Sequence, residues 1–163
     1  LELKKLNNLN YEISGEATHH GPSLSTPSLF IEIGSTQLEW KDENAALVIA
    51  KTIINLIKNP MPTNYKTAIG IGGTHYMHSF NKVLERTNIA LSYVCPKYQL
   101  EDLNENTLQQ AIKNTTGFVD FILLDWKGLG QYKEKVKKLV EETNLPFKKV
   151  NEILKDREYK ILL

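Results

Sequence analysis

The chain has 163 residues, and its 20 Lys and Arg nearly balance its 19 Asp and Glu, so the formal net charge is +1. A net charge this close to zero excludes a global attraction to nucleic acid, so any such binding has to use a local patch. No apolar run approaches the roughly 18 residues that a membrane span needs. Cys95 is the only cysteine, which excludes an intramolecular disulfide and a four-cysteine zinc site. These features predict a cytoplasmic protein with no membrane segment.

The length is that of one ordinary domain, and we expect residues 1–163 to form a single α/β domain. The first residue is Leu rather than Met, and no basic region followed by an apolar region opens the chain. We therefore expect native residues to precede Leu1.

The first part of the chain predicts two helices and two strands. Leu1 to Leu9 has apolar residues at helical spacing, and Tyr11 to Thr18 alternates apolar and polar residues as a strand does. Leu29 to Ile33 is a short apolar stretch that predicts a second strand. Asp42 is a good N-cap, and Pro60 forbids continuation, so a helix of four to five turns should lie between them. The broad apolar face of that helix predicts deep burial.

The remainder of the chain alternates strands with helices. The predicted strands are Tyr65 to Ile71, Ile89 to Cys95, Gly117 to Asp125 and an edge strand after Phe147, and the predicted helices are His75 to Arg86, Asn104 or Asn106 to Ile112, Gln131 to Thr143 and a short one in the tail. Alternation of this kind predicts an α/β fold: a three-layer sandwich with a largely parallel or mixed central sheet flanked by helices. Its site should lie at the carboxyl ends of the strands.

All four histidines fall in two clusters that follow predicted strands. The segment Glu16 to Pro22 reads EATHHGP, and Gly70 to His78 reads GIGGTHYMH. Histidine nitrogen and carboxylate oxygen both bind zinc, and a hydrolytic zinc site holds the metal with three such groups. The expected ligands are His19, His20, Glu32 and His75, with Glu16 or His78 behind them.

A metal-free alternative stays open. Adjacent histidines in a β conformation point to opposite sides, so His19 and His20 bind one ion only if the chain turns at the pair. Without a metal, one histidine would act as general base and another would donate a hydrogen bond to the developing oxyanion. Cys95 follows an apolar run and has no plausible local partner, so we interpret it as a structural residue rather than a nucleophile.

Other candidate groups lie in turns that follow strands. The glycines Gly70, Gly72 and Gly73 precede a predicted helix, where backbone N–H groups can cradle a phosphate, although the pattern matches neither the Walker motif nor the dinucleotide fingerprint. Lys97 and Lys127 each follow a strand. Each is either a solvated surface lysine or a contact to a phosphate or carboxylate of a ligand.

Five motifs together carry a resemblance to a known family. They are EATHHGP at 16–22, FIEIGSTQLEW at 30–40, GIGGTHY at 70–76, CPKY at 95–98 and DWKGL at 125–129. In this order they resemble the motifs of the archaeal and plant type D-aminoacyl-tRNA deacylases. Members of that family are longer at the amino end, so the resemblance implies that this chain corresponds to the carboxyl-terminal part of a family member.

The resemblance implies hydrolysis of the ester between a D-amino acid and the 3′ end of tRNA, with zinc as the associated cofactor. The partner is then a tRNA that carries a D-amino acid, and we expect the protein to be a monomer. The small residues Gly21, Gly72 and Gly73 would leave room for a D side chain. The alternatives are a zinc-dependent amidohydrolase or peptidase acting on a small amide, and a non-catalytic module that binds RNA ends.

The candidate residues sort into three roles. As catalytic residues we predict His20, His75, Glu16 and Lys127. As residues that bind substrate we predict Gly21, Pro22, Gly72, Gly73, Thr74, Tyr76 and Lys97. As metal ligands we predict His19, His20, Glu32 and His75.

Overall fold

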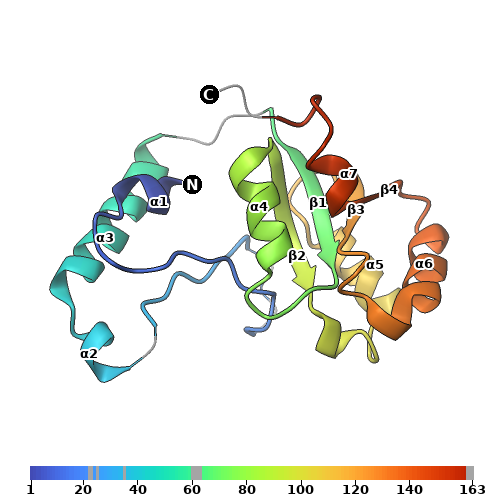
Figure 1. The fold of residues 1–163 in the computed structure, drawn as a ribbon, viewed down its shortest axis with the longest axis horizontal. Coiled ribbons are helices and arrows are strands. Elements are labelled where there is room, and N and C mark those ends of the chain that lie inside the picture. Colours follow the sequence, from blue (N-terminus) through green and yellow to red (C-terminus); the bar gives the residue numbers. More distant parts are fainter. Residues whose placement is uncertain (22–23, 25, 35, 60–63, 161–163) are drawn as a thin grey trace. The chain divides into compact units, whose positions relative to one another are not determined.

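The computed structural model describes residues 1–21, 24, 26–34, 36–59 and 64–160. The chain divides into two compact units. Unit 1 comprises Leu1–Ile13 and Ser28–Thr63, and unit 2 comprises Ser14–Pro27 and Asn64–Leu163. Each unit is described by itself below (Figure 1).

Unit 1 contains helices α1 (Glu2–Leu6), α2 (Gln37–Trp40) and α3 (Glu43–Lys58). The predicted N-cap of α3 is confirmed, because the Asp42 carboxylate accepts hydrogen bonds from the N–H groups of Asn44 and Ala45. Helix α1 packs on α3, and the Asn55 side chain donates a 3.0 Å hydrogen bond to Glu2.

The prediction that α3 is deeply buried is wrong for the described residues. Only Ala45 and Thr52 of α3 are buried, and Ile57 is 78% exposed. An apolar stripe at helical spacing identifies the face of a helix that is suited to burial. It does not supply the element that would cover that face.

Two predicted strands are also absent from the described residues. Neither 11–18 nor 29–33 adopts strand structure. The end of the first segment is instead held by single hydrogen bonds: Ala17 donates to the His75 carbonyl and Thr18 donates to the Val94 carbonyl. The alternation of apolar residues in this segment therefore reflects the burial of Ala17, which is 1% exposed, and not pairing in a sheet.

Unit 2 is built on a four-stranded sheet, as the alternation predicts (Figure 1). The strands are β1 (Lys66–Ile71), β2 (Ile89–Cys95), β3 (Phe121–Leu124) and β4 (Phe147–Lys149). Their order is β2-β1-β3-β4, and every pair is parallel. β3 is buried at every position and lies inside the sheet, because a strand that is apolar on both faces needs cover on both.

Helices cover both faces of this sheet, which confirms the three-layer α/β sandwich. Helices α4 (His78–Arg86) and α7 (Val150–Ile153) pack on one face with Ala68, Phe121 and Leu123, and α5 (Glu105–Lys113) and α6 (Lys133–Glu142) pack on the other with Ile69, Ile122 and Leu124. Alternate residues of β1 and β3 thus serve opposite layers. The short 3-10 helices η1 (Lys97–Gln99) and η2 (Gly130–Tyr132) complete the unit.

Most predicted boundaries in unit 2 hold, with two exceptions. Helix α4 begins at His78 rather than His75, because Met77 has a left-handed backbone with φ of 38° that helical structure cannot include. The strand expected from Gly117 starts only at Phe121, and Phe118 before it is 91% exposed. No helix in the described residues is both long and apolar enough to span a membrane.

Candidate active site

The candidate site lies where β1 and β2 end. His75 follows β1, Tyr98 lies in η1 directly after β2, and the Glu16 to Thr18 segment is bound beside them by its hydrogen bonds to His75 and Val94. Because parallel strands place their carboxyl ends at one edge, residues far apart in the sequence meet there.

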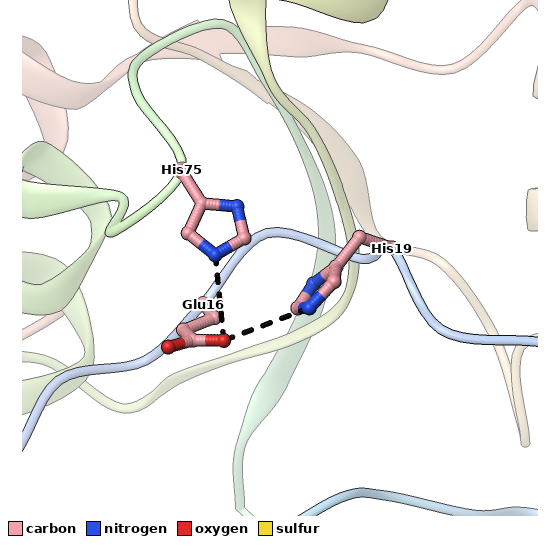
Figure 2. A group of neighbouring side chains, drawn as sticks. All are labelled: Glu16, His19 and His75. Atoms are coloured by element: carbon pink, nitrogen blue, oxygen red, sulfur yellow. Dashed lines mark ion pairs between the residues drawn. The ribbon is translucent and has the colours of Figure 1, made fainter. Parts of the chain in front are cut away.

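Glu16, His19 and His75 form a group of three possible metal ligands. One carboxylate oxygen of Glu16, Oε2, lies 3.7 Å from His19 Nε2 and 3.5 Å from His75 Nε2 (Figure 2). The ligand atoms of all three residues lie within 4.8 Å of one another. The three side chains remain partly open to solvent, at 37%, 27% and 35% exposure respectively, so a substrate can reach them.

The ring orientation of His19 is set by the backbone. His19 Nδ1 lies 2.6 Å from the Ala17 carbonyl oxygen. A carbonyl only accepts, so Nδ1 carries the proton and donates it. When Nδ1 alone carries a proton, Nε2 has a free lone pair that faces the Glu16 carboxylate. Two acceptors facing each other are an arrangement that a cation or a bound proton stabilises.

His75 has a partner that the sequence analysis missed. Its Nδ1 lies 3.2 Å from the Tyr98 hydroxyl, and the two rings stack with centroids 6.5 Å apart. This bond leaves His75 Nε2 directed at Glu16. The CPKY motif at 95–98 was the available signal, but nothing in the spacing of Tyr98 from His75 linked the two residues.

The predicted metal set and the observed group overlap in part. His19 and His75 belong to both, whereas the carboxylate of the observed group is Glu16. The His20 ring lies beside the His19 ring, with centroids 4.1 Å apart and an angle of 44° between the ring planes. Glu32 belongs to unit 1, so its role as a ligand stays a prediction.

The glycine loop after β1 is shaped by close packing. Gly72 and Gly73 have φ of 106° and 80°, which side chains rarely allow. A Cβ on Gly72 would lie 2.9 Å from the Asp125 carbonyl oxygen, and one on Gly128 would lie 2.8 Å from the Gly73 Cα. These glycines are thus required by the approach of the 72–73 and 125–128 loops.

The remaining predicted residues lie at different distances from the group. Thr74 and Lys97 line a cavity of about 340 Å³ next to the glycine loop. Tyr76 is exposed, and its ring lies edge-on to His75 at 5.1 Å. Gly21 is exposed with open space around it, and Lys127 is exposed in the loop after β3. Pro22 lies outside the described residues.

Cys95 does not have the surroundings of a nucleophile. Burial raises the pKa of its thiol to about 11, and Lys135 opposes this only in part. A thiol with such a pKa is protonated at neutral pH, and the thiolate is the reactive form. That Cys95 is a structural residue stays a prediction, and the raised pKa agrees with it.

The fold and the site define a class of protein: a parallel α/β domain with a partly open Glu-His-His group at the carboxyl edge of its sheet. Comparison with known proteins identifies the family within this class. The family model described as D-aminoacyl-tRNA deacylase matches residues 1–148. This chain belongs to the D-aminoacyl-tRNA deacylase family.

Curated relatives and a solved structure agree with this placement. The chain is 43% identical over 149 residues to the D-aminoacyl-tRNA deacylase of Thermococcus onnurineus, covering 90% of this chain and 54% of the relative. It is 39% identical over 160 residues to that of Methanosarcina barkeri, covering 94% and 50%. The crystal structure of the conserved protein of unknown function AF0625 superposes with a TM-score of 0.88 at 31% identity, covering 99% of this chain and 57% of the other. The chain thus spans about half the length of the curated relatives it matches.

Proposed function

We propose that this chain carries the hydrolytic site of a D-aminoacyl-tRNA deacylase, which cleaves the ester between a D-amino acid and the 3′ end of tRNA. The observation that supports this most is the Glu16, His19 and His75 group in a chain of that family. An aminoacyl ester is an activated acyl group, so a positioned water and a donor to the developing oxyanion are sufficient to hydrolyse it.

In this proposal Glu16 acts on the attacking water and His75 acts on the ester carbonyl. The Glu16 carboxylate lies between two imidazoles and can accept a proton from a water that attacks the ester. His75, oriented through its Nδ1 by Tyr98, presents Nε2 to the same point. In the protonated form this nitrogen would donate to the oxyanion. No covalent intermediate is needed, in keeping with the protonated state of the Cys95 thiol.

The donor set also fits zinc. Ligand atoms of a tetrahedral zinc site lie about 3.3 Å apart, as follows from bonds of roughly 2.0 Å, and the separations of 3.5 and 3.7 Å from Glu16 require little adjustment. Glu16 Oε2 and the two Nε2 atoms would hold the ion. When bound, zinc would lower the pKa of water and polarise the ester carbonyl. His20, whose ring lies beside that of His19, and Glu32 are kept as further candidate ligands, and Lys127 as a candidate catalytic residue.

The remaining candidates would bind the substrate. Thr74, Tyr76 and Lys97 lie around the loop that carries His75. Gly72 and Gly73 would let the backbone of that loop approach the ester, and Gly21 would form a wall beside His20. Pro22 is kept as a predicted substrate contact. We keep the selection of D over L side chains by the shape of this wall as part of the proposal.

The test measures deacylation and metal binding in the same set of variants. The chain should release D-tyrosine from D-Tyr-tRNA and leave L-Tyr-tRNA intact. Glu16→Gln, His19→Ala and His75→Ala should each lose at least about 100-fold in kcat/KM, since each removes a group that contacts the reacting atoms. Glu12→Gln, the same change on an exposed carboxylate four residues earlier, is the matched control.

Zinc binding supplies a readout independent of activity. Adding zinc should raise the Tm of the wild-type chain and of Glu12→Gln, but not that of His19→Ala or His75→Ala, because a ligand that binds the folded state stabilises it. Wild-type deacylation by Glu16→Gln, His19→Ala and His75→Ala would refute the assignment of the site. Faster cleavage of a small amide than of D-Tyr-tRNA would favour the amidohydrolase, and tRNA binding without cleavage would favour the RNA-end binding module.

A further inference from the structure

A cavity of about 340 Å³ lies at the loop that carries His75, because Gly73 and Thr74 of that loop line it. It is lined by the side chains of Thr74, His78, Ser79, Lys97 and Asp125 together with Gly73 and Gly128. Thr74 lines the cavity while His75, the next residue, belongs to the group. The cavity and the group therefore contain neighbouring residues of one loop.

Four of the lining residues are donors: Thr74, His78 and Lys97 are exposed, and Ser79 is half-buried. Lys97 and His78 supply an ammonium and an imidazole, and Thr74 and Ser79 supply hydroxyl groups. In the described part of the chain, none of these four side chains makes a hydrogen bond or ion pair. Helix α4 also begins at His78 without a side-chain cap. Two nitrogen groups and two hydroxyls around one space are the chemistry that binds a phosphate.

Asp125 supplies acceptor oxygens to the same lining. Asp125 Oδ1 accepts the Gly128 N–H at 3.1 Å, and its Oδ2 faces Gly73. A carboxylate repels a phosphate but accepts a hydrogen bond from a hydroxyl. The lining therefore combines donors for an anion with an acceptor for a hydroxyl, and a ribose 5′-phosphate presents both matching groups.

The frame of the cavity is tied to the sheet by backbone bonds. The Lys97 N–H donates to the Gly73 carbonyl at 2.9 Å, and the Gly72 N–H donates to the Cys95 carbonyl at 2.8 Å. These bonds hold the start of η1 against the glycine loop, so the Lys97 side chain projects from a fixed point. The end of that side chain lies against Gly130, where a Cβ would be 3.2 Å from Nζ.

We propose that this cavity binds the 5′-phosphate and the ribose hydroxyl of the terminal nucleotide of the substrate. Lys97 and Thr74 would hold the phosphate, and Asp125 would accept the hydroxyl. Only the ribose lies between that phosphate and the 3′ ester, which matches a cavity one residue away from His75. The inference rests on the proposed function, and it names a site that reads the nucleotide rather than the amino acid.

The experiment compares two minimal substrates that differ only in the phosphate: 3′-O-D-tyrosyl-adenosine and its 5′-monophosphate. The wild-type chain should hydrolyse the phosphorylated ester with a kcat/KM roughly tenfold or more higher, the ratio expected for one charge-assisted hydrogen bond. In Lys97→Gln this ratio should fall toward one. Lys113→Gln should keep it, because Lys113 ends α5, before the chain reaches the amino end of β3.

The outcomes separate this site from the proposed function. A ratio near one in the wild type, or a ratio unchanged by Lys97→Gln, overturns the phosphate site while leaving the deacylase intact. Hydrolysis of neither ester would refute the proposed function instead. In that case, titration with 5′-AMP and adenosine, followed by NMR, still tests the cavity: tighter binding of 5′-AMP that is lost in Lys97→Gln supports it, and equal binding overturns it.

Discussion

The geometry of Glu16, His19 and His75 depends on bonds made by the other nitrogen of each imidazole. His19 is held through the Ala17 carbonyl and His75 through the Tyr98 hydroxyl. Partners of this kind set the tautomer and direction of a ligand histidine. Both rings consequently present Nε2 to the same carboxylate oxygen, although only one of the two partners is a side chain that mutation can remove.

Tyr98→Phe removes the hydroxyl that orients His75. We expect zinc affinity and kcat to fall by roughly tenfold, since loss of such a partner typically costs 10- to 100-fold, while the far-UV circular dichroism spectrum stays unchanged. Zinc titration and deacylation of D-Tyr-tRNA measure the two effects. Wild-type values for both would show that Tyr98 does not position the ring.

Cys95→Ala should keep deacylation within about twofold, because the thiol takes no part in the chemistry. Burial raises its pKa to about 11, so at pH 8 the thiolate fraction is on the order of one in a thousand. Iodoacetamide should therefore alkylate the folded wild-type chain slowly at pH 8 and faster as the pH approaches 11. Rapid alkylation at pH 8 together with loss of activity would restore Cys95 as a candidate nucleophile.

At the scale of secondary-structure elements, the loops after β1 and β3 contact each other through glycines. Gly128 approaches Gly73 so closely that a Cβ at 128 would lie 2.8 Å from the Gly73 Cα. The loop after β3 is thereby pressed against the loop after β1. Neither backbone can shift far without moving the strand end to which it is joined.

Gly128→Ala should destabilise the fold by roughly 1–3 kcal/mol, the usual cost of overpacking. The matched control is Gly34→Ala, where no atom lies within 4 Å of the added Cβ. Urea unfolding followed by circular dichroism compares the two variants. Equal stability for both would show that the two loops are not in close contact in solution.

Asp120 links the starts of β1 and β3. Its carboxylate accepts hydrogen bonds from the Thr67 N–H at 2.8 Å and from Lys66 Nζ at 3.0 Å. Burial opposes ionisation, but the Thr67 and Lys66 interactions outweigh it and lower the pKa of Asp120. A carboxyl with a lowered pKa stabilises the fold above its unfolded pKa of about 3.9 and loses that contribution as the pH falls through the folded value.

Asp120→Asn should therefore cost about 1 kcal/mol at pH 7, comparable to one hydrogen bond. The difference from wild type should shrink between pH 5 and pH 2, where the wild-type carboxyl also becomes neutral. Urea unfolding at several pH values measures it. A difference that is constant with pH would mean that the charge of Asp120 does not contribute.

On the scale of the whole molecule, burial is unevenly divided between the two units. Among the described residues, unit 1 buries only Ala45 and Thr52, whereas two layers of apolar side chains cover the sheet of unit 2. Local stability follows the amount of buried apolar contact.

The amides of α3 should therefore exchange with deuterium much faster than those of β1 and β3. Native-state hydrogen exchange followed by mass spectrometry measures the difference. Equal protection of α3 and the central strands would show that the exposed apolar residues of α3, such as Ile57, are covered in solution.

The sequence by itself determined the α/β sandwich of unit 2, with the choice between a largely parallel and a mixed sheet left open, the N-cap of α3 and the central place of β3. It also predicted that His19 and His75 share one site, and the two side chains do lie together. The features of the fold follow from local rules: apolar periodicity, capping by Asp42 and the continuous apolar run of β3. Each rule acts over a few residues and can therefore be applied along a sequence.

Only the tertiary structure decided that residues 11–18 and 29–33 form no strands, that α3 leaves its apolar face exposed, and that Tyr98 orients His75. A strand needs a pairing partner, and burial needs a covering element. Neither is specified by the alternation of side chains within one segment. Likewise Glu16 joins His19 and His75 because two backbone hydrogen bonds fasten its segment beside β2, a contact between residues more than fifty positions apart.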